Sequence, residues 1–162
     1  MSPRTDKRAV NPSALASNRK ALHDYFVLEK YEAGIELVGT EIKVVCSAQA
    51  SLQGAYVRVE PDGQLWLLQA NIPPYEFGNR FNHDPRRPRR LLMHRREILK
   101  LKGQSEQKGL TLVPLRLYRS PRGKVKVEVA VCRGKADADK RETIKRREAD
   151  KEARRAMARY GR

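Results

Sequence analysis

The chain has 162 residues, and its 35 lysines and arginines exceed its 19 aspartates and glutamates, which gives a formal net charge of +16. This length allows one folded domain with extensions, and the charge indicates a polyanionic partner such as RNA, DNA or an anionic membrane. We expect no membrane partner and a cytoplasmic protein, because no apolar run approaches the roughly 20 residues that span a bilayer and the polar N-terminus contains no secretory signal.

The pattern of the sequence changes at Asn18. Residues 1–17 are rich in Ser, Pro, Arg, Lys and Ala without periodicity, which predicts a flexible basic arm. Residues 21–36 supply the first strand or two. Residues 38–48 predict a helix, because several of their apolar side chains fall on one side: Val38, Ile42, Val45 and Cys46.

A hairpin and a second helix follow. A glycine-containing turn joins strands predicted over residues 55–59 and 64–69. Residues 94–102 predict a helix that ends at Gly103, after which residues 104–108 can add one short helical turn.

The last two strands give the clearest pattern in the sequence. Apolar residues alternate with polar ones over residues 125–132, and this period of two predicts a strand. A Pro-Gly turn connects it to another strand over residues 110–119. Because hairpins of neighbouring strands alternate with short helices, we predict a mainly β protein, a small antiparallel β-barrel with two or three flanking helices.

Two segments concentrate the positive charge. Residues 86–100 carry seven Lys/Arg and one Glu, and the arginine side chains of this Pro/Arg-rich stretch suit phosphate groups and base edges. Residues 133–162 carry twelve Lys/Arg and six Asp/Glu but few large apolar side chains. Strong helix formers without a core to join predict a basic tail that is disordered when free. The expected domains are the arm at 1–17, the barrel at 18–132 and this tail at 133–162.

Nothing in the sequence resembles an active site. His23, His83 and His94 lie in unrelated segments, and no metal-ligand spacing or phosphate-binding glycine motif accompanies them. Cys46 and Cys132 fit small apolar side chains with reduced thiols better than a nucleophile or a disulfide. We therefore expect no enzymatic activity, no cofactor and no metal.

Several motifs resemble those of the SsrA-binding protein family, small protein B. They occur in the family's order and spacing from Asn18 to the end of the chain, so that only the N-terminal arm lies outside the resemblance. The matching segments are Asn18 to Tyr25, Tyr31 to Lys43, Arg89 to Ile98, Lys108 to Leu115 and Asp139-Lys140-Arg141.

The resemblance implies an oligonucleotide-binding-like (OB-like) barrel that binds the tRNA-like domain of transfer-messenger RNA (tmRNA). Proteins of this family deliver tmRNA to ribosomes stalled on truncated messages, a rescue called trans-translation. The aminoacylated tmRNA reaches the ribosome with elongation factor Tu and GTP. The resemblance also implies that the C-terminal tail enters the vacant decoding site, beside small-subunit rRNA, and becomes helical in the mRNA channel. We expect the adaptor to be a monomer.

By the same resemblance, two groups of residues receive roles. The group expected to bind RNA matches the family's RNA-contacting face, with cations of the barrel beside it: Asn18, Lys20, His23, Tyr25, Glu32, Lys43, Arg90, Leu92, His94 and Arg95. A carboxylate suits such a face because it can accept hydrogen bonds from base amino groups. The group expected to bind the ribosome is Gly134, Lys135, Asp139, Lys140, Arg141, Ile144, Lys145 and Met157. Ala136 and Ala138 replace a basic residue and a ring of the family pattern, so we expect the tail to anchor more through charge.

Two other functions stay open. A general basic RNA-binding or ribosome-associated module without a dedicated RNA partner would be displaced by excess bulk tRNA, with a steep dependence on salt. A nuclease or other RNA-modifying enzyme would show turnover with added divalent metal, although the sequence lacks the carboxylate and histidine clusters for it.

Overall fold

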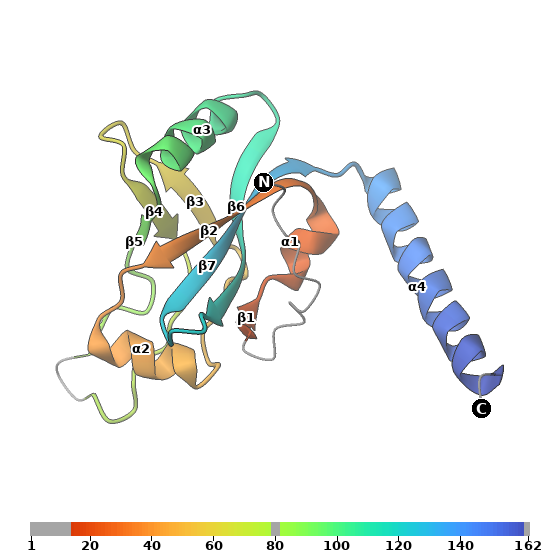
Figure 1. The fold of residues 1–162 in the computed structure, drawn as a ribbon, viewed down its shortest axis with the longest axis horizontal. Coiled ribbons are helices and arrows are strands. Elements are labelled where there is room, and N and C mark those ends of the chain that lie inside the picture. Colours follow the sequence, from red (N-terminus) through yellow and green to blue (C-terminus); the bar gives the residue numbers. More distant parts are fainter. Residues whose placement is uncertain (1–13, 79–81, 161–162) are drawn as a thin grey trace.

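The computed structural model describes residues 14–78 and 82–160, and within these residues it contains seven strands and four helices (Figure 1). In chain order these are β1 (Ala14–Ser17), α1 (Arg19–Asp24), β2 (Tyr25–Ile35), α2 (Gly39–Cys46), β3 (Tyr56–Val59), β4 (Leu65–Leu68), β5 (Arg89–Leu92), α3 (Arg95–Ser105), β6 (Leu110–Arg119), β7 (Val125–Gly134) and α4 (Asp137–Tyr160). None of the described helices is both long and apolar enough to cross a membrane.

The strands pair antiparallel in a closed ring, which confirms the predicted mainly β, OB-like architecture. The order runs β6-β3-β4-β5-β2-β7, and β7 pairs again with β6 to complete the ring. The first strand, β1, lies outside this ring and pairs with the second half of β6. Two glycine-containing turns, at Gly63 and Gly123, connect β3 to β4 and β6 to β7, and both glycines adopt positive φ, as such turns require.

The interior of the ring is filled by alternate side chains of the strands. Val127, Val129 and Val131 of β7 are buried there, as the period of two predicted, and Leu101 of α3 joins them. A smaller apolar cluster lies on the outer side of the sheet, where Ala21 of α1 packs with Cys132 and neighbouring apolar side chains of β6 and β7. This second cluster fixes α1 against the sheet, and Cys132 takes the predicted role of a small buried apolar residue.

A buried ion pair ties the proline-rich loop before β5 to α2. Glu41 and Arg89 are both fully buried, and Arg89 Nε donates to Glu41 Oε2 at 2.6 Å while its other nitrogens donate to the carbonyls of Ala70 and Pro85. Arg87 donates to the second oxygen of Glu41. Two arginines of the Pro/Arg-rich stretch are thus used to hold this segment in place. The sequence could not indicate this, because Glu41 is 48 residues from Arg89.

The structure corrects the predicted boundaries near the N-terminus. Residues 14–17, assigned to the flexible arm, form β1 on the edge of β6, whereas residues 1–13 lie outside the described residues. Residues 21–24, expected in a strand, belong to the short helix α1. Only Ala21 of this helix is buried, so it carries too little apolar pattern to be recognised.

Two boundaries further along the chain also differ. Helix α3 does not end at Gly103 but continues to Ser105, because Leu101 is fully buried against the sheet and the packing outweighs the modest helix cost of one glycine. Between α3 and β6, it is Gly109 that adopts positive φ. Strand β7 extends to Gly134 and so takes two residues from the predicted tail.

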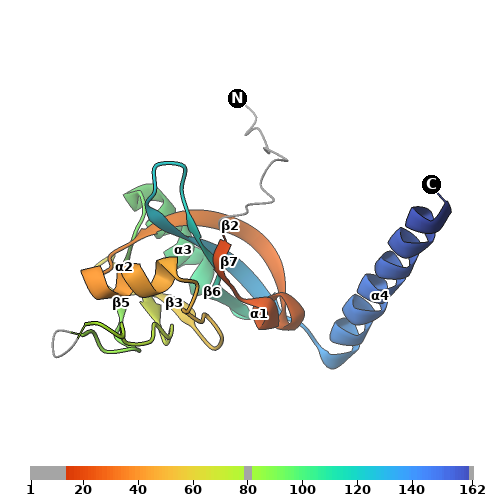
Figure 2. The same ribbon diagram turned by 90° about the horizontal axis from the view of Figure 1, so that it is seen from below.

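The rest of the tail is α4, which extends away from the barrel (Figures 1 and 2). Its strong helix formers account for this helix. The resemblance implied that the tail becomes helical when it is bound to the ribosome. That helix formation is coupled to ribosome binding stays a prediction.

Candidate nucleic-acid interface

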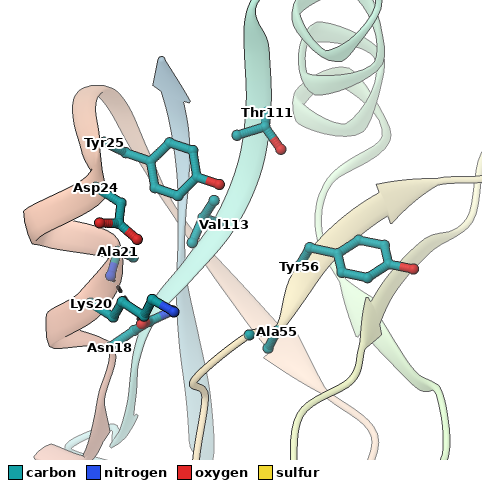
Figure 3. A pocket seen from close by; sticks show the side chains of 10 residues that line it. Asn18, Lys20, Ala21, Asp24, Tyr25, Ala55, Tyr56, Thr111 and Val113 are labelled. Atoms are coloured by element: carbon teal, nitrogen blue, oxygen red, sulfur yellow. Dashed lines mark hydrogen bonds between the residues drawn. The ribbon is translucent and has the colours of Figure 1, made fainter. Parts of the chain in front are cut away.

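A cleft of about 380 Å³ lies between α1 and the edge of β3, and it contains three of the residues predicted to bind RNA (Figure 3). Lys20 and Tyr25 line its α1 side, and Tyr56 lines its β3 side. Tyr56 is exposed, so its ring is accessible from solvent. The ammonium group and the phenol ring on the α1 side of this open cleft, with the second exposed ring at its β3 rim, can contact phosphate and stack on unpaired bases.

Asn18 is the third residue predicted to bind RNA that lines this cleft. Its side chain is only 4% exposed, and it caps α1 by accepting a hydrogen bond from the amide of Ala21 at 3.2 Å. Its Nδ2 donates to the carbonyls of Leu52 and Pro114. Because this side chain is turned inward, it positions α1, and its contact with RNA stays a prediction.

Replacing Asn18 tests this positioning role. Asn18→Ala should lower the free energy of unfolding by about 2 kcal/mol or more, because it removes a helix cap and leaves two carbonyls without their donor. Asn18→Ser keeps an uncharged capping oxygen but loses the amide donor, so it should have a smaller effect. Urea denaturation of both variants, with Lys20→Ala as a surface control, measures the difference, and equal stability of all four proteins would contradict the role.

A second surface lies on the outer side of β2, β5 and β7 and brings together Glu32 and Leu92. Gly34 pairs with Leu92 on one side and with Lys126 on the other, and Glu32 is two residues earlier on the same face of β2. A Cβ at Gly34 would stand 3.3 Å from the Leu92 Cβ, so glycine permits this close pairing. Leu92 is 45% exposed and borders a cleft of about 390 Å³ that Lys126 also lines.

Glu32 belongs to a polar network that the sequence did not reveal. The buried Tyr118 hydroxyl donates to the Glu32 carboxylate, and Arg116 stacks on the Tyr118 ring at 4.6 Å. Arg116 also donates to Glu128 at 2.9 Å. Burial, and then the hydrogen bond to Glu32, raise the pKa of Tyr118, which keeps the hydroxyl a donor. The carboxylate of Glu32 is therefore oriented, yet the residue stays exposed and can accept further hydrogen bonds.

A third group of predicted residues lies where β5 leads into α3. Arg90 and Arg95 line a cleft of about 440 Å³, together with Lys102 of α3. His94 is exposed at the N-cap of α3. Arg90 also has Glu36 nearby, with 3.7 Å between the charged atoms. This group is positively charged and solvent-accessible, which suits contact with phosphates.

The remaining two predicted RNA-binding residues make local contacts. Lys43 of α2 places its Nζ 4.9 Å from the centre of the Tyr75 ring. His23 of α1 has its Nδ1 2.9 Å from the Asp24 carboxylate, beside the first cleft. The ten predicted residues therefore divide over several parts of the barrel and α1 rather than forming a single site.

The root of the tail contacts the end of α1. The backbone amide of Lys135 donates to the carbonyl of Asp24 at 2.9 Å, and both Lys135 Nζ and Arg147 approach the carbonyl of Leu22. Of the predicted ribosome-binding residues, Gly134 ends β7 and precedes Lys135, and Arg141, Ile144, Lys145 and Met157 are exposed on α4. Asp139 and Lys140 lie in the first turns of α4, but their side chains are outside the described part of the structure.

Comparisons with known proteins identify the family. The family model for the SmpB protein matches residues 15–159. The chain belongs to the SmpB family. SsrA-binding proteins of Symbiobacterium thermophilum and Carboxydothermus hydrogenoformans are 54% and 52% identical to it, over 88% and 90% of this chain and 90% and 97% of those proteins. A chain in the solved structure "tmRNA-SmpB: a journey to the center of the bacterial ribosome" is 47% identical, with a TM-score of 0.64 over 79% of this chain and 92% of that one.

The structure also places residues outside the predicted RNA-binding group beside these clefts. Tyr56 lines the β3 side of the first cleft, with its ring directed away from Lys20 (Figure 3). Arg116, Tyr118 and Lys126 lie around Glu32 and Leu92. A signal for some of them was present, because the polar positions that alternate with the valines of β7 point outward. Strand periodicity alone could not show which neighbouring strands they would face.

Proposed function

We propose that this protein is the RNA-binding adaptor of trans-translation, which binds the tRNA-like domain of tmRNA and delivers it to stalled ribosomes. The observation that supports this function is the 47% sequence identity with a chain of the tmRNA-SmpB structure, together with the match of the SmpB family model to residues 15–159. The role is that of a structural adaptor rather than an enzyme, and action on ribosomes places it in the cytoplasm. The aminoacylated RNA would travel with elongation factor Tu.

We assign the two activities to different parts of the chain. The barrel surface around the first two clefts would bind the RNA, because it combines exposed cations with aromatic rings and an oriented carboxylate. The exposed basic face of α4 would enter the decoding site and mRNA channel, where phosphates surround it. The link at Lys135 joins these two parts.

Competition distinguishes a dedicated adaptor from a general RNA-binding module. We expect the wild-type protein to retain the tRNA-like domain of tmRNA in a gel-shift assay that contains a large excess of bulk tRNA at physiological salt. Specific contacts persist under these conditions, whereas purely electrostatic binding weakens steeply with salt and with competing phosphates. Complete displacement by bulk tRNA would contradict a dedicated partner.

Replacing Glu32 tests the second surface. Glu32→Ala should weaken affinity for the tRNA-like domain about tenfold, because it removes a charged acceptor for base amino groups and releases Tyr118 from its orientation. Glu106→Ala, an exposed carboxylate at the end of α3, should change affinity little and serves as the control. Fluorescence anisotropy with labelled RNA measures both, and wild-type affinity in Glu32→Ala would remove this face from the interface.

A further inference from the structure

The loop between β4 and β5 presents an aromatic ring to solvent. Phe77 is 73% exposed, in contrast to the buried apolar residues of the barrel. Its ring meets that of Tyr75 edge to face, with 5.6 Å between the ring centres and an angle of 70° between the planes. The Phe77 side chain gains little from burial in the folded chain, and most of its ring is accessible to a partner.

Hydrogen bonds hold the backbone around these rings in a fixed shape. The Tyr75 amide donates to the Asn82 side chain at 2.9 Å, and the Asn82 amide group donates back to the Tyr75 carbonyl. Gly78 closes the turn by donating to the same carbonyl, and a Cβ at Gly78 would stand 2.8 Å from Asn82 Nδ2 and 3.2 Å from Thr40 of α2. A side chain at Gly78 would therefore displace the Asn82 side chain and crowd Thr40 of α2.

A histidine fastens the same loop to α2. His83 Nε2 lies 2.8 and 3.0 Å from the carbonyls of Ile72 and Pro73, so this nitrogen must carry the proton. Its Nδ1 then accepts from the Thr40 hydroxyl at 2.8 Å. The described residues on both sides of Phe77 are therefore anchored, which lowers the entropic cost of binding a partner.

The charge beside the rings indicates what kind of partner fits. Lys43 covers the Tyr75 ring with its Nζ 4.9 Å from the ring centre, so Tyr75 is occupied while Phe77 is open. A single open ring beside a cation lacks the broad apolar area of a protein-docking patch. The same pair suits a nucleotide, because the base can stack on the ring and its phosphate can approach the ammonium group.

We propose that Phe77 is a stacking site for an unpaired base of the bound RNA, with Tyr75 setting the orientation of the ring and Lys43 contacting the adjacent phosphate. This inference rests on the proposed function, in that the RNA is taken to be the tRNA-like domain of tmRNA. It adds the β4–β5 loop to the RNA-binding surface of the barrel.

Affinity measurements with full-length protein and the tRNA-like domain test the site. Phe77→Ala should weaken binding about tenfold, whereas Phe77→Trp should preserve or improve it, because a larger ring still stacks. Leu28→Ala, which removes another exposed apolar side chain from β2, is the matched control and should bind as the wild type does. Wild-type affinity in Phe77→Ala would overturn the inference, whereas failure of the wild-type protein to bind this RNA would overturn the proposed function itself.

Fluorescence gives an independent readout. The chain has one tryptophan, Trp66, so a Trp66→Phe/Phe77→Trp double variant carries its only indole in the loop. Saturating RNA should quench this fluorescence strongly, since a base that stacks on the indole removes its emission. Unchanged fluorescence at RNA concentrations that saturate the anisotropy signal would show that no base stacks at this position and would overturn the inference.

Discussion

Deletion of residues 140–162 should abolish peptide tagging on stalled ribosomes while changing affinity for the tRNA-like domain by less than about twofold. The physical reason is that the RNA-binding clefts are built by the barrel and α1, whereas the side chains described in α4 are exposed and the helix extends away from the barrel (Figure 2). Changes in one part of a protein have little effect on another part with which it shares few contacts, so removing most of α4 should leave RNA binding by the barrel nearly unchanged. A tagging assay in a reconstituted translation system, combined with RNA anisotropy, measures the two activities separately.

A point substitution distinguishes the contribution of the helical conformation of α4 from that of its positive charge. Ile144→Pro interrupts α4 at a cost of about 3 kcal/mol in helix stability while leaving every lysine and arginine in place, and Ile144→Ala keeps the helix. If tagging requires a helical tail, the proline variant should lose most of it and the alanine variant should keep more. Equal loss of RNA affinity and tagging in the deletion would contradict the division of activities, and full tagging by Ile144→Pro would contradict a helical role.

Glu41→Gln should lower the free energy of unfolding by about 3–5 kcal/mol, the largest stability effect that we expect in the barrel. The substitution leaves the guanidinium of Arg89 fully buried without its counter-charge, and an uncompensated buried charge is far more costly than a lost surface pair. Glu36→Gln is the control, because Glu36 and Arg90 form an exposed pair at 3.7 Å whose loss should cost less than about 1 kcal/mol. Urea denaturation at pH 7 compares the two variants, and similar destabilisation by both would contradict the role of the buried pair.

The Glu41 carboxylate should also make the free energy of unfolding depend on pH in the acidic range. Burial alone would raise the pKa of Glu41, but hydrogen bonds from Arg87, from the Val38 amide and from Arg89 outweigh burial and hold it below the usual 4.5. A folded-state pKa below the unfolded one means that the stabilisation is complete above about pH 4.5 and is lost as the pH falls through the folded-state value. The wild-type protein should therefore lose more stability than Glu41→Gln on acidification below that pH.

Local signals in the sequence predicted much of the fold. The turns around Gly63 and Gly123, the alternating valines of β7 and the apolar side of α2 each depend on residues a few positions apart, so they could be recognised without neighbours. The motifs from Asn18 to Arg141 indicated the family, and the comparisons confirm it. The net charge indicated a polyanionic partner, which agrees with this family.

What the sequence by itself determined was therefore the class of fold, the family and the chemical kind of partner. Only the tertiary structure decided which charged residues face solvent, because that depends on groups far apart in the chain. Glu41 forms an ion pair with Arg89, 48 residues away, and Tyr118 donates a hydrogen bond to Glu32, 86 residues away. Tertiary packing likewise explains why α3 continues past Gly103, since burial of Leu101 outweighs the low helix propensity of glycine. It also explains why the Asn18 side chain is buried, since its amide group donates hydrogen bonds to backbone carbonyls. In the Pro/Arg-rich stretch, Arg87 and Arg89 thus hold the fold through Glu41, whereas Arg86 is exposed to solvent.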